Sequence, residues 1–301
     1  MRFIRIFLCY DNCMIYVITG PTGSGKTEIG KVLSSKFNAP IINADAFQIY
    51  KGMDIGTAKI NKDDPYYDKH YLLDIITPEE NFSVMQYQKI FRETLDSLLK
   101  QYKDVIVVGG TGLYIRASFY DYCFPKEEKD DVSDLEKLSN DELYEMLLSL
   151  DKEASKTIHK NNRKRVIRAI SIARTSSLTK SENINQQEHK LIYDNVRFLM
   201  ISPNRETLYE NINKRVDLMF DKGLVEEVKS LQKAYNLSLT AKAAIGYKEI
   251  IDALHNNTNL EDAKELIKKR TRNYAKRQVT YFKHQLPVEI YEDKESLLKA
   301  I

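Results

Sequence analysis

The feature that most constrains the fold of this chain is the loop Gly20-Pro21-Thr22-Gly23-Ser24-Gly25-Lys26-Thr27, which fits the pattern G-x-x-x-x-G-K-[ST]. Residues 15–19 before it form a β-branched and aromatic run, typical of a buried strand. After it, apolar side chains recur at helical spacing through Phe37. In this setting the loop's backbone N–H groups bind anionic oxygens, Lys26 adds a charge and the Thr27 hydroxyl can ligate Mg²⁺. The sequence therefore predicts a phosphate site that includes Mg²⁺.

Further apolar runs alternate with helical segments along the chain. Strands are expected at 41–42, 105–108 and 196–201, with a helix around 91–99. This alternation predicts an α/β fold, a P-loop NTPase-like parallel sheet with helices on both faces. Ligands of such sheets bind at the carboxyl ends of the strands. The loop 20–27, Asp45 and Gly109-Gly110-Thr111 all follow strand ends, so one cleft is expected to hold all three.

The middle of the chain changes in charge and lacks strand-like runs. Residues 122–192 are expected to form an inserted helical domain that divides the core into 1–121 and 193–301. The second part of the core is expected to hold long helices over 204–235, 242–255 and 260–284. Residues 1–13 are interpreted as an N-terminal extension, with Met14 as an alternative start.

Cysteine usage favours a reducing compartment, and hydropathy indicates no membrane segment. Three cysteines make no disulfide framework. No apolar run approaches the ~20 residues that span a bilayer. Arg5 interrupts the apolar start and no small-residue cleavage site follows it, so an export signal is not expected. A cytoplasmic monomer without a membrane segment is predicted.

Basic side chains gather in two stretches. Residues 264–284 hold eight Lys or Arg against one Glu, and residues 159–174 hold six Lys or Arg without an acid. On a helix, Arg272 and Lys276 lie near one face, with Tyr274 beside them. Basic side chains with aromatics between them suit a phosphate backbone and unstacked bases, whereas a solvated helix face normally carries balancing acids. The pattern predicts nucleic-acid binding, with Arg272, Lys276 and Arg277 as candidates.

The end of the apolar run 104–108 favours a transferase. A motor ATPase or GTPase normally adds a carboxylate at the end of a second apolar strand. Here that run ends in Gly109-Gly110-Thr111, and the nearest acidic candidate is Asp45. Taken alone, Asp45 is equally a helix cap or turn residue. A small-molecule P-loop kinase of the shikimate or gluconate type, or an RNA-binding P-loop NTPase without prenyl transfer, remain alternatives.

Six blocks, in chain order, resemble bacterial tRNA dimethylallyltransferases, the tRNA isopentenyltransferase family. They are GPTGSGKT (20–27), DAFQIYKGMDIGTAK (45–59), HYLLDI (70–75), GGTGLYI (109–115), IGYKEI (245–250) and AKRQVTYFK (275–283). Several of these blocks have no role in generic P-loop kinases. The chain departs from the family pattern at Ala46, usually Ser, at Lys164, where a Gln-Arg pair is usual, and at Tyr281, usually Trp.

The resemblance implies that the loop holds the diphosphate of dimethylallyl diphosphate as a leaving group. The five-carbon allyl group would pass to N6 of the adenosine 3′ of the anticodon in tRNA. By the same resemblance, Asp45 accepts a proton from N6 and Thr111 hydrogen-bonds the bridging oxygen, while Thr27, with Asp45 as a second candidate, holds Mg²⁺. The residues implied to contact the flipped nucleotide and anticodon loop are Asp45, Ala46, Phe47, Gln48, Lys164, Arg165, Val166, Ile167 and Arg168. A cytokinin-forming adenylate isopentenyltransferase shares this chemistry, but a mononucleotide would not need the basic helix.

Overall fold

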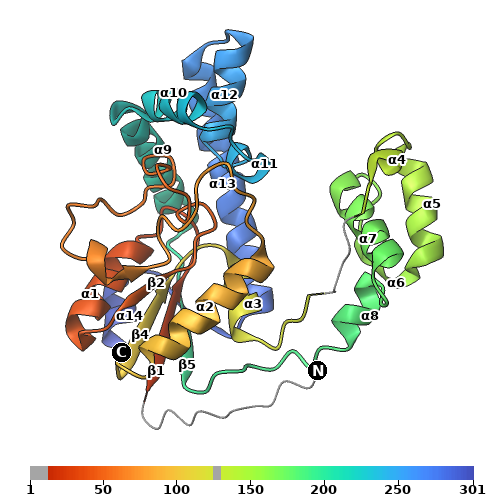
Figure 1. The fold of residues 1–301 in the computed structure, drawn as a ribbon. Helices are drawn as coiled ribbons and strands as arrows, with labels where there is room; N and C mark the ends of the chain where they lie inside the picture. The colour runs from red at the N-terminus through yellow and green to blue at the C-terminus, as the bar shows by residue number, and fades with distance from the viewer. Residues whose placement is uncertain (1–12, 125–129) are drawn as a thin grey trace. The chain divides into compact units, whose positions relative to one another are not determined.

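The computed structural model describes residues 13–124 and 130–301, and its core is a six-stranded, all-parallel sheet (Figure 1). The strand order is β3-β2-β4-β1-β5-β6. The strands are β1 (Met14–Thr19), β2 (Ile41–Asn43), β3 (His70–Tyr71), β4 (Asp104–Val108), β5 (Val196–Ile201) and β6 (Val288–Tyr291). The predicted α/β class and the strands 15–19, 41–42, 105–108 and 196–201 are confirmed. β3 and β6 were not predicted, because a two-residue strand and one with exposed Glu289 carry no clear apolar pattern.

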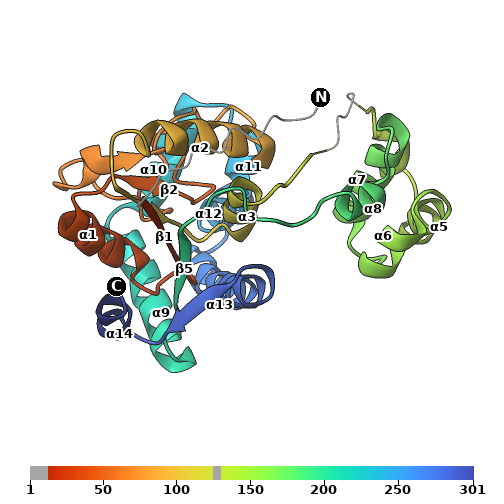
Figure 2. The ribbon, with the colours of Figure 1, turned by 90° about the horizontal axis from the view of Figure 1, so that it is seen from below.

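Helices cover both faces of the sheet, because the strands carry apolar side chains on each side. On one face, α1 (Lys26–Phe37) and α14 (Lys294–Lys299) pack against Ile18, Ile41 and Leu199. On the other lie α2 (Val84–Leu98) and α3 (Gly112–Phe119) (Figure 2). The Tyr87 and Tyr114 rings of these two helices stack at 4.0 Å. The two-sided burial explains why the strands read as nearly continuous apolar runs.

Of the helices between β5 and β6, the first four lie mainly beyond the carboxyl ends of the strands, and the last runs back from there past the sheet (Figure 1). They are α9 (Arg205–Asp221), α10 (Leu224–Ala234), α11 (Leu239–Lys242), α12 (Tyr247–Asn256) and α13 (Leu260–Gln285). The prediction of one helix over 204–235 is wrong, because Gly223 adopts a left-handed conformation (φ 91°) that ends α9 and caps α10. The helix expected over 242–255 is likewise split, with α11 ending before Gly246 (φ 97°) and α12 starting after it. The helix expected over 260–284 is confirmed.

By its internal contacts the chain forms two compact units, residues 1–118 with 193–301, and residues 119–192. The second unit contains α4 (Ser133–Glu136), α5 (Asn140–Leu150), α6 (Lys152–Thr157), α7 (Arg163–Thr175) and α8 (Lys180–Asn185). It has a hydrophobic core of its own, in which Leu143, Leu147 and Ile170 are fully buried. The expected insertion, 122–192, falls within this unit.

Two further expectations concern the ends and the apolar segments of the chain. The N-terminal extension, 1–13, lies outside the described residues except for Cys13, after which β1 begins. Within the described ranges, every helix is too short or too polar to cross a membrane.

Candidate active site

The phosphate-binding loop connects β1 to α1, as its sequence pattern predicts. Gly25 adopts a left-handed conformation (φ 87°) and caps α1, which starts at Lys26. A side chain at Gly20 is excluded because its Cβ would lie 2.2 Å from the carbonyl oxygen of Ile201. The loop therefore lies directly against β5, with its N–H groups at the amino end of a helix where anions bind.

A cavity of about 500 Å³ opens at the carboxyl ends of the strands, within the usual range for small-molecule sites. Polar side chains and loop residues line it from several segments. They include Thr22, Gly23, Gly25, Lys26 and Thr27 of the loop, Asp45 and Gln48 after β2, Gly109 and Gly110 after β4, Arg215 of α9, and Tyr274, Arg277 and Gln278 of α13. The apolar part of the wall includes Phe47, Val216, Met219 and Ile267. The expected cleft at the strand ends is thus present, with α9 and α13 as additional walls.

Asp45 is both a turn residue and a carboxylate of the cavity, the two roles that its sequence position allowed. Its Oδ1 accepts a hydrogen bond from the Phe47 N–H at 2.9 Å, and its own N–H donates to the Asn43 side chain at 3.1 Å. These bonds fix the turn after β2. Its Oδ2 accepts no hydrogen bond from the described residues, and the side chain lines the cavity. One carboxylate oxygen is therefore left to meet a ligand.

Thr111 follows Gly110 in the chain but, unlike Gly109 and Gly110, is not among the residues that line the cavity. Its Oγ1 accepts a hydrogen bond from the Ala46 N–H at 2.9 Å, and Ala46 is not among the residues that line the cavity. Because a hydroxyl has one donor and two acceptor sites, this bond leaves the Thr111 proton for another partner. The Tyr274 hydroxyl lies within hydrogen-bonding reach of Thr111, and burial raises the pKa of this phenol.

Lys26 and Arg215 are two of the three described basic side chains that line the cavity with Asp45; the third is Arg277. Lys26 donates from Nζ to the Pro21 carbonyl at 2.7 Å, and Arg215 donates to the Thr57 carbonyl at 3.2 Å. Burial, with the neighbouring Arg215 charge, lowers the pKa of Lys26 to about 7, while Asp45 opposes the change. Burial also lowers the pKa of Arg215. The site is therefore set to receive negative charge.

Sequence reasoning missed two site residues, Arg215 and Gln278. Gln278 is 5% exposed and joins the two glycine-rich loops: its Oε1 accepts from the Thr22 N–H, and its Nε2 donates to the Gly110 carbonyl, both at 2.8 Å. It lies at helical spacing from buried Ala275 and Phe282, so the apolar face of α13 could have indicated it. Arg215 likewise lies between buried Ile212 and Val216 on α9.

The candidate tRNA-binding residues of α13 occupy two different places. Arg277 lines the cavity, with its guanidinium over the Tyr274 ring at 5.7 Å. Arg272 and Lys276 instead lie over the ring of Tyr209 on α9, at 5.9 and 6.0 Å, and Arg272 also donates to Asn213. The expectation that Tyr274 flanks the outer basic face is wrong, because its ring is part of the cavity wall.

The candidates near the target nucleotide and in the insertion also differ in exposure. Gln48 lines the cavity and donates to the carbonyls of Thr57 and Ala58. On α7, Lys164, Arg165 and Arg168 are exposed. Val166 is fully buried in the core of the insertion and Ile167 packs against that core, so direct contact of Val166 with RNA is not supported. It alternates with the basic residues because one face of the amphipathic helix must be apolar.

The donor set of the cavity fits Mg²⁺. The Thr27 hydroxyl and the Asp45 carboxylate both line it, and Mg²⁺ in phosphate sites takes only one or two protein ligands, with phosphate oxygens and water as the others. The described residues contain no cluster of three or more His, Cys, Asp or Glu side chains suited to a metal. Thr27 and Asp45 would therefore hold the ion only together with a phosphorylated ligand.

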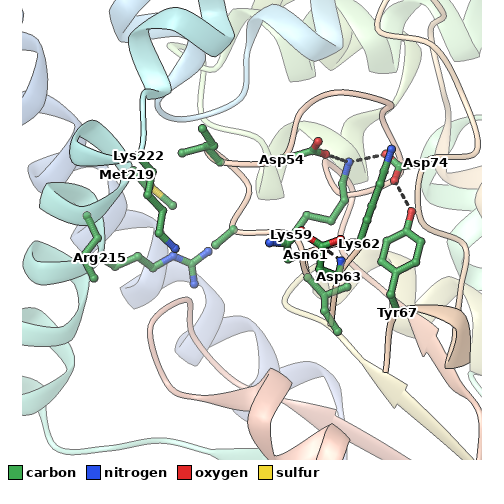
Figure 3. A pocket seen from close by; sticks show the side chains of 14 residues that line it. Asp54, Lys59, Asn61, Lys62, Asp63, Tyr67, Asp74, Arg215, Met219 and Lys222 are labelled. Atoms are coloured by element: carbon green, nitrogen blue, oxygen red, sulfur yellow. Dashed lines mark hydrogen bonds and ion pairs between the residues drawn. The ribbon is translucent and has the colours of Figure 1, made fainter. Parts of the chain in front are cut away.

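A second cavity, of about 710 Å³, shares Ala58, Arg215 and Met219 with the first. Figure 3 shows Arg215 reaching into it from α9, opposite the turn that carries Asp54 and Lys59. The buried Lys59 ammonium pairs with Asp54 and Asp74, both at 2.6 Å, and Tyr67 donates to Asp74. This network fixes the segment between β2 and β3, the same segment that carries Asp45 and Gln48.

These features define an α/β protein with a P-loop cavity for a phosphorylated ligand and a carboxylate facing it. The model of the IPP transferase family matches residues 48–285. The chain is 42% identical over 280 residues to a tRNA dimethylallyltransferase of Anoxybacillus flavithermus, covering 92% of this chain and 90% of that protein. The chain belongs to the IPP transferase family.

Solved structures agree with this assignment. A tRNA isopentenylpyrophosphate transferase of Staphylococcus epidermidis superposes with a TM-score of 0.66 at 38% identity, covering 95% of this chain and 96% of that one. A eukaryotic dimethylallyltransferase acting on tRNA gives a TM-score of 0.79 at 28% identity, covering 94% of this chain and 75% of that one. The chain is therefore a transferase with the fold of these enzymes, and the kinase and NTPase alternatives are not supported.

Proposed function

We propose that this chain transfers the dimethylallyl group of dimethylallyl diphosphate to N6 of the adenosine 3′ of the anticodon, position 37, in tRNA. Family membership supports the reaction. The observation that carries the residue roles is the meeting, in one cavity, of a P-loop with Lys26, a second cation at Arg215 and the unpaired oxygen of Asp45. A phosphorylated electrophile and an amine that must lose a proton require these opposite charges.

At the electrophile, the diphosphate lies on the N–H groups of Gly23–Thr27 and between the Lys26 and Arg215 charges. The carbon–oxygen bond of the allyl group breaks and the electron pair leaves with the diphosphate. Donors fixed before the reaction stabilise this growing charge without reorganisation. The Thr111 hydroxyl donates a hydrogen bond to the bridging oxygen while it accepts one from the Ala46 N–H. Bound Mg²⁺, held by Thr27, would neutralise part of the diphosphate charge and leave Oδ2 of Asp45 for the nucleophile.

At the nucleophile, N6 of adenine forms the new nitrogen–carbon bond and loses a proton. This exocyclic amine is a poor nucleophile because its lone pair is delocalised into the ring. Asp45 accepts the N6 proton at Oδ2, as a general base. The target base must leave its stack to reach this cavity, so the nucleotide flips, with Gln48 and Phe47 at its edge and face.

The wider tRNA surface consists of basic residues on each of the two units. On the core, Arg205, Arg272 and Lys276 surround Tyr209. On the insertion, Lys164, Arg165 and Arg168 share the exposed side of α7. The anticodon stem-loop is the proposed partner of both sets. The proposed oligomeric state is a monomer. The proposed compartment is the cytoplasm, because the cysteine usage suits a reducing environment.

The direct test combines radiolabelled dimethylallyl diphosphate, Mg²⁺ and unmodified tRNA, followed by nucleoside analysis. Wild-type protein should label one adenosine without ATP. Asp45→Asn should lower single-turnover transfer by about 10²–10⁴, the usual contribution of a general base, while diphosphate and tRNA affinities change little. Asp252→Asn, an exposed acid on α12, is the control and should be fully active. Transfer that requires ATP hydrolysis, or normal single-turnover chemistry in Asp45→Asn, contradicts these roles.

A further inference from the structure

The carboxylate of Glu227 on α10 collects four donors. Its Oε2 accepts from the N–H groups of Asp54 and Ile55, at 3.1 and 2.7 Å. Its Oε1 accepts from the Gly56 N–H at 3.2 Å and from the Tyr247 hydroxyl at 2.5 Å. Three successive backbone N–H groups form an anion-binding concavity of the kind that elsewhere holds phosphate. Here the chain's own carboxylate fills it.

The ring of Tyr247 closes the same turn from the side. A Cβ at Gly56 would lie 2.4 Å from the Tyr247 ring, so only glycine fits there. Tyr247 is 1% exposed, and its burial beside Glu227 raises the pKa of the phenol, which keeps it protonated as a donor. Glu227 and Tyr247 together hold residues 54–56 in one position.

The next residue in this turn connects it to the cavity. The Thr57 carbonyl accepts from the Arg215 guanidinium at 3.2 Å and from the Gln48 amide at 3.1 Å. In the described part of the chain this is the hydrogen bond that orients Arg215. Its guanidinium lies close enough to Lys26 for its charge to lower the pKa of that ammonium beyond the effect of burial. The Asp45 carboxylate is close enough to oppose the lowering of the pKa of Arg215 by burial. Figure 3 shows the guanidinium extended from α9 toward this turn.

We propose that Glu227, anchored by Tyr247, is a positioning residue that orients Arg215 toward the diphosphate through the turn 54–57. The inference rests on the proposed function, since it assumes a diphosphate beside Arg215. Glu227 does not line the cavity and touches no reacting atom. Its effect passes through the Thr57 carbonyl. A small displacement of such a group is enough to lower activity by about 10²-fold.

Glu227→Gln is the central variant. It keeps the shape of the side chain but turns an N–H₂ group toward backbone N–H donors, so part of the turn loses its acceptor. Calorimetric titration with inorganic diphosphate and Mg²⁺ measures the donor site without catalysis. We expect about a tenfold loss of diphosphate affinity in Glu227→Gln. Glu226→Gln, the exposed neighbour on α10, is the matched control and should change the affinity less than twofold.

A double-mutant cycle separates positioning from general destabilisation. In an Arg215→Ala background, Glu227→Gln should change diphosphate affinity less than twofold, because the group it orients is gone. Equal tenfold losses with and without Arg215, or no loss in either background, overturn the inference. Tyr247→Phe removes one donor to Glu227 and should lower diphosphate affinity two- to threefold, again only with Arg215 present. This variant replaces Glu227→Gln in the cycle if Glu227→Gln does not fold. Wild-type protein that fails to bind diphosphate would refute the donor site itself, and the inference with it.

Discussion

The buried Lys26 lowers the folding stability of the ligand-free protein and is placed to bind the diphosphate. In the empty cavity its pKa falls to about 7, because burial and Arg215 disfavour the charged form. Below pH 7 the ammonium is charged in both folded and unfolded protein, and folding bears the whole cost of burying it. Between pH 7 and 10.5 the unfolded chain binds more protons than the folded one, so this group makes stability rise with pH. A bound diphosphate would reverse the effect by favouring the charged form.

Lys26→Met should therefore stabilise the ligand-free protein while abolishing transfer. The gain in Tm should be larger at pH 6 than at pH 9, because the cost that methionine removes is greatest where lysine is fully charged. Thermal unfolding between pH 6 and 9.5 measures this. Lys31→Met is the control on the same helix: ion pairs with Asp64 and Glu28 raise the pKa of Lys31, so its loss should lower Tm. A Tm gain for Lys26→Met that does not depend on pH would contradict the argument.

At the scale of the element, α13 performs different tasks on two sides of one helix. Tyr274 and Gln278 face the cavity and the glycine-rich loops. Arg272 and Lys276 face Tyr209 on α9. A helix can do both because residues four apart share a face, and residues two apart do not. The basic stretch 264–284 therefore forms an outer surface only in part.

The outer basic side of α13 should contribute to tRNA affinity through phosphates. We expect Arg272→Ala with Lys276→Ala to weaken tRNA binding and to flatten the slope of log affinity against log salt by about 1–2, since up to two fewer counterions are released. Filter binding at several salt concentrations measures both effects. Lys229→Ala with Lys233→Ala, exposed on α10, gives the control. If the affinity and slope of both double variants equal those of wild type, this side of α13 is a solvated face.

At the scale of the whole molecule, the residues proposed for chemistry and part of those proposed for RNA recognition belong to separate units. The described residues that line the cavity of about 500 Å³ belong to the core unit, and the insertion is stabilised by its own core. Changes on the insertion surface should therefore act on tRNA binding without altering the donor site. The KM for tRNA should therefore change while the diphosphate affinity does not.

Replacing Lys164, Arg165 and Arg168 together by Ala should raise the KM for tRNA by about tenfold or more, because phosphate contacts dominate such affinities. The diphosphate affinity and the Tm should stay close to wild type, since all three side chains are exposed. Steady-state transfer with varied tRNA and varied donor separates the two effects. Lys137→Ala with Lys152→Ala is the control, because Lys137 follows α4, Lys152 begins α6 and both side chains are exposed. An unchanged KM for tRNA would remove α7 from the RNA surface.

The sequence by itself determined the parts of this protein that depend on local pattern. The loop 20–27, the strands around it and the apolar faces of α1 and α13 follow from spacings within a few residues, because backbone geometry repeats over that distance. The turn bonds of Asp45 are equally local. The clustering of the loop, Asp45 and Gly110 at one edge follows from parallel strands, whose carboxyl ends meet.

Only the tertiary structure decided which distant side chains complete the site. Gln278 meets Thr22 across 256 residues, and Glu227 meets Asp54 across 173. Neither contact has a sequence signal of its own, because each depends on how whole helices pack against the sheet. The tertiary structure also placed Tyr274 in the cavity and Val166 in a core, and ended α9 at Gly223. Periodicity fixes which residues share a face, but packing decides what that face meets.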